Sequence, residues 1–297
     1  HNTQYVHSRG RRRGREVGAV PTGASTAADE RGGRPRVGHL KNRGRRRVVG
    51  PPPPPLIADR VRHVGDQVAV VIAETRDQAK DAAELIEIDY QELPAIISTG
   101  DAMKSGSAQV WAQATTHVCY DWELGDKAGT DTVFANAAVT VREEILNPRV
   151  HPCPLETCGC VASFNKATGY LTLYVTTQIP HLLRTVLAML SGVAESKIRV
   201  VGGDIGGGFG NKVPIYPGYV VATVASIVTG VPVKWIETRI DNISTTGFAR
   251  DYHGVGELAA DKDGRIKGLR FTALADHGAF NSHVSATKFP AGLFSIC

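Results

Sequence analysis

The chain has 297 residues, of which 42% are hydrophobic and 21% are charged, enough for two domains with buried cores. Its formal net charge of +5 is unevenly distributed: residues 1–50 hold 13 basic and 3 acidic residues, a balance of +10, whereas the remainder holds 21 basic and 26 acidic residues, a balance of −5. The mildly acidic remainder gives no reason from charge to expect nucleic acid or an anionic membrane as a partner.

The chain contains five cysteines: Cys119, Cys153, Cys158, Cys160 and Cys297. An odd number in a large chain argues against a secreted disulfide framework. No stretch reaches the ~20 apolar residues of a membrane span, and no apolar segment follows the N-terminal arginines as a signal peptide requires. We therefore expect a cytoplasmic protein. Because the chain begins at His1 and stops within an apolar run, we also expect it to be part of a longer polypeptide.

Residues 1–55 differ from the rest of the sequence. Arg-Arg-Arg occurs at 11–13 and again at 45–47 in a background of Gly, Pro and Ala, and five prolines follow at 51–55. Neither helical nor strand periodicity is visible. Two interpretations remain open: a basic, disordered arm, or a segment that is not native because GC-rich DNA was translated in the wrong frame. We favour the second.

Residues 56–118 indicate a first compact domain. The run 67–73 is typical of a buried strand, and Thr75 can cap a helix whose apolar residues follow at helical spacing. Residues 86–90 alternate like a half-exposed strand that ends before Pro94. The polar stretch 101–118 is expected to be loop.

A second region begins at 122 and extends to 297. Its patterns predict strands at 138–145, 161–164, 170–175, 197–201, 231–237, 254–260 and 265–275, and helices at 182–190 and 217–228. Residues 165–169 have the composition of a hairpin turn, and Gly192 suits a helix end. The predicted fold class is α+β with mixed sheets.

The most informative motif is the glycine loop, Asp204 to Lys212 with sequence DIGGGFGNK. Successive glycines allow positive φ and let the backbone approach a ligand closely, so that its N–H groups can line an anion- or oxo-binding concavity. The spacing fits neither the dinucleotide motif nor the phosphate-loop motif. A flexible turn is the competing interpretation, but six glycines between Gly202 and Gly210 are more than a turn needs.

Three other features could carry chemistry. Gln178 ends an alternating strand and can donate to an oxo group, although a solitary Gln is usually a solvated surface residue. The segment 151–160 holds three cysteines and a histidine, which suits either a metal site or buried small groups on one side of a strand. The segment 248–253 and His277 combine Arg, Asp, Tyr and His, a set that is more often structural.

Four of these stretches resemble a known family. Leu155-Glu156, Thr177-Gln178, the glycine loop and 230–234 occur in this order and at these intervals in molybdenum hydroxylases of the xanthine oxidase type. The stretches 154–162, 204–213, 216–220 and 248–253 are nearly identical to those of the molybdenum-carrying subunits that oxidise carbon monoxide. The resemblance covers about 56–297 and excludes 1–50.

The resemblance implies a fold and a site. It implies an α/β hammerhead domain at 56–118, followed by the first part of a molybdopterin-binding domain at 122–297, truncated at both ends. Gln178 matches the glutamine that hydrogen-bonds an oxygen ligand of molybdenum without ligating the metal itself. Gly207, Gly208, Phe209 and Gly210 match the loop beside the metal and its pterin dithiolene.

It also implies an activity. The expected enzyme oxidises carbon monoxide with water to carbon dioxide and passes electrons to an iron–sulfur small subunit and a flavin medium subunit, in a dimer of heterotrimers. The expected cofactor is molybdenum–molybdopterin in its cytosine dinucleotide form, with copper held through a cysteine. That cysteine and the catalytic glutamate match positions after Cys297, so no catalytic residue is assigned here.

Val213 bears on the choice of substrate. Purine-oxidising relatives have a substrate-binding glutamate at this position, and an apolar residue suits a small uncharged gas better. Two alternatives stay open: a related molybdenum hydroxylase acting on an aldehyde or heterocycle, and an inactive partial gene product that binds little molybdenum by itself.

Overall fold

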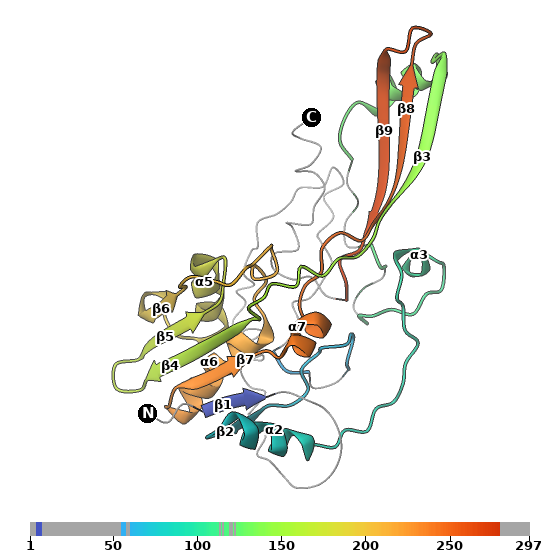
Figure 1. The fold of residues 1–297 in the computed structure, drawn as a ribbon. Helices are drawn as coiled ribbons and strands as arrows, with labels where there is room; N and C mark the ends of the chain where they lie inside the picture. Colours follow the sequence, from blue (N-terminus) through green and yellow to red (C-terminus); the bar gives the residue numbers. More distant parts are fainter. Residues whose placement is uncertain are drawn as a thin grey trace.

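The computed structural model describes residues 4–7, 55–57, 60–112, 114, 116–118, 121 and 123–279, and for residues 4–7 it describes the backbone alone. The described chain forms two β-sheets, with helices packed on the larger one (Figure 1). The larger sheet has the strand order β2 (Val71–Ala73), β1 (Gln4–His7), β7 (Val233–Ile236), β4 (Gly159–Asn165), β5 (Tyr170–Val175) and β6 (Ile198–Val201). The smaller sheet has the order β3 (Val139–Asn147), β8 (Tyr252–Ala260) and β9 (Ile266–Ala275).

The described α-helices are α2 (Arg76–Glu84), α3 (Thr99–Ala102), α4 (Lys127–Ala135), α5 (Pro180–Ser191), α6 (Pro217–Thr229) and α7 (Arg239–Thr245), with a short 3-10 turn, η1 (Glu195–Lys197), before β6. Three of the six described α-helices, α2, α5 and α6, follow helical patterns in the sequence. With the mixed sheets, the helices confirm the predicted α+β class.

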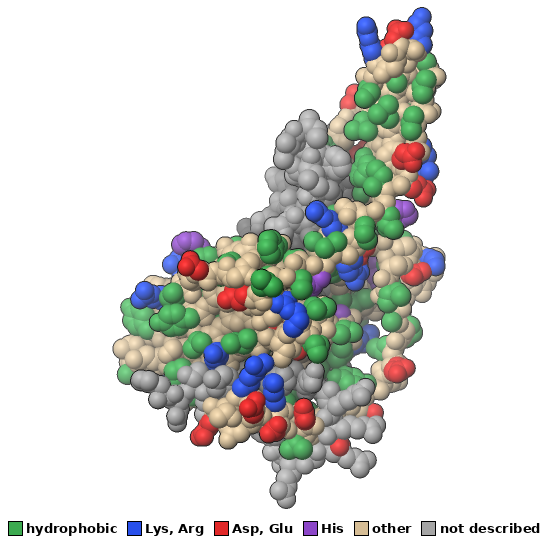
Figure 2. All heavy atoms as spheres, viewed as in Figure 1, with side chains coloured by type: hydrophobic (Ala, Val, Ile, Leu, Met, Phe, Trp, Pro, Cys, Tyr) green, Lys and Arg blue, Asp and Glu red, His purple; other side chains and the backbone are tan. Residues whose placement is uncertain are grey.

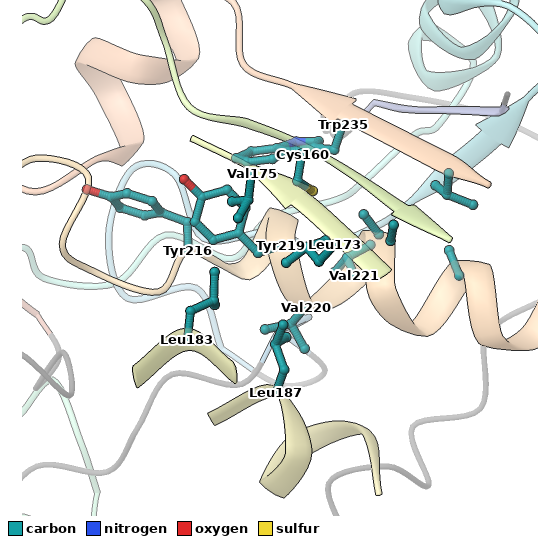
Figure 3. Close-up of a cluster of buried hydrophobic side chains, with 14 of the residues drawn as sticks. Cys160, Leu173, Val175, Leu183, Leu187, Tyr216, Tyr219, Val220, Val221 and Trp235 are labelled. Carbon is teal, nitrogen blue, oxygen red and sulfur yellow. The ribbon is translucent and has the colours of Figure 1, made fainter. Parts of the chain in front are cut away.

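The main core lies between the larger sheet and helices α5 and α6, as Figure 3 shows. Leu171 and Leu173 of β5 are fully buried, and such side chains each contribute about 1.5–3 kcal/mol on burial. Tyr219 of α6 meets the Trp235 ring of β7 edge to face, with ring centroids 5.5 Å apart. Most residues of α6 are buried, which is why its sequence is apolar on all sides.

Local signals in the sequence set the element ends. Thr75 caps α2 as predicted, and it also forms a capping box with Gln78. Gly192 ends α5 in the left-handed conformation, with φ 73°, which confirms the predicted C-cap. The hairpin predicted around 165–169 is confirmed by the antiparallel pairing of β4 with β5.

The smaller sheet extends away from the main body (Figure 1) and exposes all nine residues of β3. Hydrophobic side chains are visible on this extension in Figure 2. The side chains of Val139, Val141 and Ile145 lie on one face of β3, because residues separated by an even number of positions point to the same side of a strand. At its base, Arg149 binds Asp251 at 2.7 Å and Asp276 at 2.6 Å.

Several expectations need correction. Residues 86–90 were predicted as a strand but are irregular, because no described strand offers them a hydrogen-bonded neighbour. The strand predicted at 67–73 contains only Val71–Ala73, and the stretch 101–118, predicted as loop, begins with the end of α3. The sequence patterns did not predict α4, α7 or β1. Strand β1 pairs antiparallel with β2 and parallel with β7, although it falls within the segment predicted to lack order.

No helix among the described residues is long and apolar enough to cross a membrane.

The packing of α6 on β7 generates the first prediction. A Cβ added to Gly218 would lie 2.2 Å from Cε2 of Trp235, so Gly218→Ala should lower the free energy of unfolding by about 1–3 kcal/mol. The control is Gly100→Ala in α3, where the nearest atom would be 3.9 Å away and helix propensity favours Ala by up to ~1 kcal/mol. Urea unfolding of both variants measures the difference, and wild-type stability for Gly218→Ala would contradict the packing described here.

Candidate functional site

The sheet topology brings two predicted site segments together. Strands β5 and β6 pair in parallel, so their carboxyl ends lie at the same edge of the sheet. Gln178 follows β5, and the glycine loop follows β6. Ligands of sheets with parallel strands commonly bind beyond these carboxyl ends. The juxtaposition of Gln178 with the loop is therefore a consequence of strand pairing.

The Gln178 side chain is oriented by the loop itself. Its Oε1 accepts hydrogen bonds from the backbone N–H of Gly210 at 3.1 Å and of Lys212 at 3.2 Å. The backbone N–H of Gln178 donates in return to the carbonyl of Lys212 at 3.0 Å. Because Oε1 has two donors and Nε2 has no acceptor among the described residues, the group left for a ligand is the Nε2 donor.

Gly208 lies directly under this amide. A Cβ at Gly208 would be 2.6 Å from both Cδ and Oε1 of Gln178, so the close approach requires glycine. Gly207 and Gly210 have φ values of 93° and 83°, and Phe209 has φ 51°, unusual for a non-glycine residue. The loop thus uses the positive φ that its sequence predicted.

The centre of the loop leaves two donors available. In the described part of the chain, the backbone N–H groups of Gly208 and Phe209 have no hydrogen-bond acceptor. The Phe209 side chain is 74% exposed, and its ring lies against Gly207. Consecutive amides with alternating backbone conformations form a concave surface that suits an anion or an oxo group.

The last residue of the glycine loop, Lys212, is a buried lysine for which the sequence indicated no role. The side chain of Lys212 is fully buried, and its Nζ lies 2.5 Å from Oε2 of Glu156. The same oxygen accepts the N–H of Gly206 at 2.8 Å. Partial burial acts to raise the pKa of Glu156, but the hydrogen bonds from Lys212 and Gly206 outweigh it and the pKa is lowered. The two partners are 56 residues apart, so no local pattern could have indicated the pair.

Behind the loop lies a buried polar network. Asn211 donates to Thr246 Oγ1 at 3.0 Å and to the carbonyl of Gly247 at 2.9 Å, while Tyr216 donates its hydroxyl to the Asn211 carbonyl at 2.6 Å. The loop is thereby tied to the end of α7. The Oδ1 of Asn211 has no partner among the described residues.

Glu237 is a buried carboxyl in the same region. Its Oε2 accepts from the backbone N–H of Cys158 at 3.0 Å and from Asn242 Nδ2 at 2.9 Å, and its Oε1 has no partner within the described ranges. Burial raises the pKa of Glu237 because the ionised form loses its hydration.

The cysteine segment is a structural feature of the core. Cys160 lies in β4 and Cys158 directly precedes that strand, and both side chains are buried. Burial raises the pKa of both thiols. Cys153 is exposed. Among the described residues no group of three or more His, Cys, Asp or Glu side chains could hold a metal ion. Cys119 and Cys297 lie outside the described residues.

The segment 248–253 lies at the base of the smaller sheet. Arg250 and Asp251 have φ values of 67° and 66°, and Asp251 is paired with Arg149 rather than with its neighbour. Arg149 also lies over the Phe248 ring, 4.2 Å from its centroid. These contacts tie together the ends of β3, β8 and β9 at the base of the smaller sheet, which gives the segment a structural role.

The comparisons with known proteins agree on one family. Residues 110–296 match the family model of the molybdopterin cofactor-binding domain, and residues 38–94 match that of the aldehyde oxidase and xanthine dehydrogenase a/b hammerhead domain. The predicted order, a hammerhead domain followed by a molybdopterin-binding domain, is confirmed. The hammerhead match begins at residue 38, whereas the resemblance was predicted to start at about residue 56.

Individual relatives are also similar. The chain is 55% identical over 255 residues to the carbon monoxide dehydrogenase large chain of Hydrogenophaga pseudoflava, covering 82% of this chain and 32% of the relative. It is 49% identical to the carbon monoxide dehydrogenase large chain of Afipia carboxidovorans, covering 82% and 31%. The solved structure of reconstituted CO dehydrogenase from Oligotropha carboxidovorans matches with a TM-score of 0.72 and 50% identity, covering 78% and 30%. The chain spans about a third of the length of these curated relatives.

The raised pKa of Glu237 generates a prediction about pH. A carboxyl whose pKa is raised by folding stabilises the protein fully below its ordinary pKa, and this contribution is lost as pH rises through the raised pKa. The neutral isostere in Glu237→Gln should therefore lose less stability than the wild type as pH increases above the ordinary carboxyl range.

Urea unfolding from about pH 5 to about pH 9 measures this difference. The control is Glu92→Gln at an exposed position, which should follow the wild-type curve. Parallel stability curves for Glu237→Gln and wild type would contradict a raised pKa of Glu237 in the folded protein.

Proposed function

This chain belongs to the molybdopterin cofactor-binding domain family, and we propose that Gln178 and the glycine loop form one wall of its molybdenum–molybdopterin site. The observation that carries the proposal is the cluster of three donors that have no acceptor among the described residues: Gln178 Nε2 and the N–H groups of Gly208 and Phe209. They lie at the carboxyl ends of two parallel strands.

The chemistry of these donors fits the cofactor. Molybdenum–molybdopterin presents oxygen ligands and a phosphate, which accept hydrogen bonds, and all three donors are neutral groups on a fixed backbone. A Cβ at Gly208 would collide with the Gln178 amide, so glycine at this position lets that amide lie against the loop. When bound, the cofactor supplies the oxidation–reduction chemistry. Gln178, Gly207, Gly208, Phe209 and Gly210 would bind it and orient it.

The division of roles comes from the family resemblance. Gln178 would hydrogen-bond a ligand of the metal and would not ligate the metal itself. Its orientation does not depend on the cofactor, because Gly210 and Lys212 already hold Oε1. Phe209, with its ring exposed beside the donors, excludes water from one side of the site.

The substrate we propose is carbon monoxide, oxidised with water to carbon dioxide. Two curated relatives of which the chain covers about a third are carbon monoxide dehydrogenase large chains. Val213, which follows the buried Lys212, places an apolar and partly buried side chain next to the loop. A charged or strongly hydrogen-bonding substrate would find no partner in that side chain.

The proposal extends to parts beyond these residues. We propose the cytosine dinucleotide form of molybdopterin, copper held through a cysteine that is not among these 297 residues, and electron transfer to an iron–sulfur subunit and a flavin subunit in a dimer of heterotrimers. No residue of the described chain is assigned to copper or to catalysis.

Cofactor binding is tested with Gly208→Ala. The added methyl group would push the Gln178 amide away from Gly210 and Lys212, and losing one net hydrogen bond of about 1.4 kcal/mol corresponds to about tenfold weaker binding. Molybdenum per chain should fall in the intact protein. The matched control is Gly203→Ala, where a Cβ would meet nothing within 4 Å and molybdenum content should stay at the wild-type level. Equal molybdenum in both variants would contradict the proposed wall.

The substrate is tested by assaying the intact, molybdenum-loaded protein with carbon monoxide, an aldehyde and a purine. We expect reduction of an artificial electron acceptor with carbon monoxide only. Turnover of the aldehyde or the purine without turnover of carbon monoxide would assign the chain to a related molybdenum hydroxylase instead.

A further inference from the structure

We propose that Glu156 is a positioning residue whose carboxylate holds the glycine loop in the shape that presents its free donors. We call the contacts of Glu156 with Gly206 and Lys212 the Glu156 clamp. The part of this inference that concerns the cofactor rests on the function proposed above; the part that concerns the loop does not.

The clamp joins the two ends of the loop through one atom. Oε2 of Glu156 accepts the N–H of Gly206 at 2.8 Å and lies 2.5 Å from Nζ of Lys212. The backbone N–H of Glu156 also donates to the carbonyl of Gly206 at 3.1 Å. The segment 206–212 is thereby closed at both ends, and the free N–H groups of Gly208 and Phe209 lie between them.

The clamp requires a close approach of two backbones. A Cβ at Gly206 would lie 2.6 Å from Cβ of Glu156, so only glycine allows the two segments to meet at this distance. This observation is independent of the ion pair. Glycine is required at position 206 for the approach of Glu156, whereas glycine at position 208 makes room for Gln178.

The position of Glu156 is itself fixed by α7. Arg239, at the start of that helix, donates to the carbonyls of Pro154 and Leu155, both at 2.7 Å. The same guanidinium donates to Asn242 Oδ1 at 3.0 Å. The carboxylate is therefore presented from a rigid segment rather than from a mobile loop.

The clamp offsets the conformational freedom of the loop. Glycine-rich backbone loses more conformational entropy on ordering than any other, and an ordered site requires contacts that select one conformation. Gln178 stabilises one loop conformation through its hydrogen bonds to Gly210 and Lys212. Glu156 stabilises the same conformation through Gly206 and the Lys212 side chain. A buried ammonium without its carboxylate is strongly unfavourable, which makes the Lys212 end of the clamp difficult to open.

The test is amide hydrogen exchange of the full chain without cofactor, followed by mass spectrometry. In Glu156→Gln, peptides covering 203–213 should exchange about tenfold faster than in wild type, because a hydrogen bond to a charged group is lost. Peptides covering α6 should be unchanged. The control is Glu195→Gln: Glu195 pairs with Arg184 at 3.0 Å and is 41% exposed, against 39% for Glu156, but lies away from the loop.

A second variant separates positioning from folding. Glu156→Leu with Lys212→Met removes both charges together, so no buried charge is left unpaired, and thermal unfolding should stay close to that of wild type. Its loop should still exchange faster. Wild-type exchange of 203–213 in this variant would overturn the proposal.

Cofactor content provides the final readout. In the intact protein both Glu156 variants should hold less molybdenum than Glu195→Gln, and equal molybdenum would overturn the positioning role. Wild-type protein without molybdenum would instead contradict the proposed function, while the exchange experiment would still decide whether the clamp orders the loop.

Discussion

The parallel pairing of β5 with β6 is the constraint on which the candidate site depends. It brings the residues after two strands to one edge of the sheet, although Gln178 and Gly210 are 32 residues apart. The core beneath this edge holds the pairing in place, since Leu171 and Leu173 of β5 are fully buried against α5 and α6. A shift of one residue in this pairing would turn those side chains away from the core and displace Gln178 from the loop.

Two carboxyl groups near the loop have opposite environments and different tasks. Glu156, at the flank, has a lowered pKa because its hydrogen bonds to Lys212 and Gly206 outweigh its partial burial. Glu237, behind the loop, has a raised pKa because burial dominates over its hydrogen bonds. The Glu156 carboxylate closes the loop at its ends through Gly206 and Lys212, and the Glu237 carboxyl supports α7 from within the core through Asn242. The donors left in the concave centre of the loop are the neutral groups of Gln178, Gly208 and Phe209.

The sequence predicts what local signals encode. Thr75, the hairpin at 165–169, Gly192 and the apolar helix at 217–228 were placed correctly because capping, turn chemistry and periodicity act over a few residues. The strand expected at 86–90 failed because an alternating pattern cannot say whether a partner strand is available. The insertion of β1 between β2 and β7 is a non-local pairing, and the arginine-rich sequence that follows β1 shows no pattern that predicts a strand.

The candidate site shows the same difference between local and long-range information. The glycine loop and Gln178 could be named from the sequence, and their contact is present, but the contact itself comes from the sheet order. Glu156 and Lys212 each belong to a motif that is visible in the sequence. The ion pair between them joins residues 56 positions apart, and no local pattern indicates it. Crystallography of the molybdenum-loaded protein, with anomalous scattering at the molybdenum edge, tests whether Gln178 and the glycine loop form one wall of a molybdopterin site. We expect the molybdenum peak beside Gln178 and the glycine loop, with Nε2 facing a ligand of the metal. A peak elsewhere, for example beside the cysteines of 153–160, would contradict this expectation.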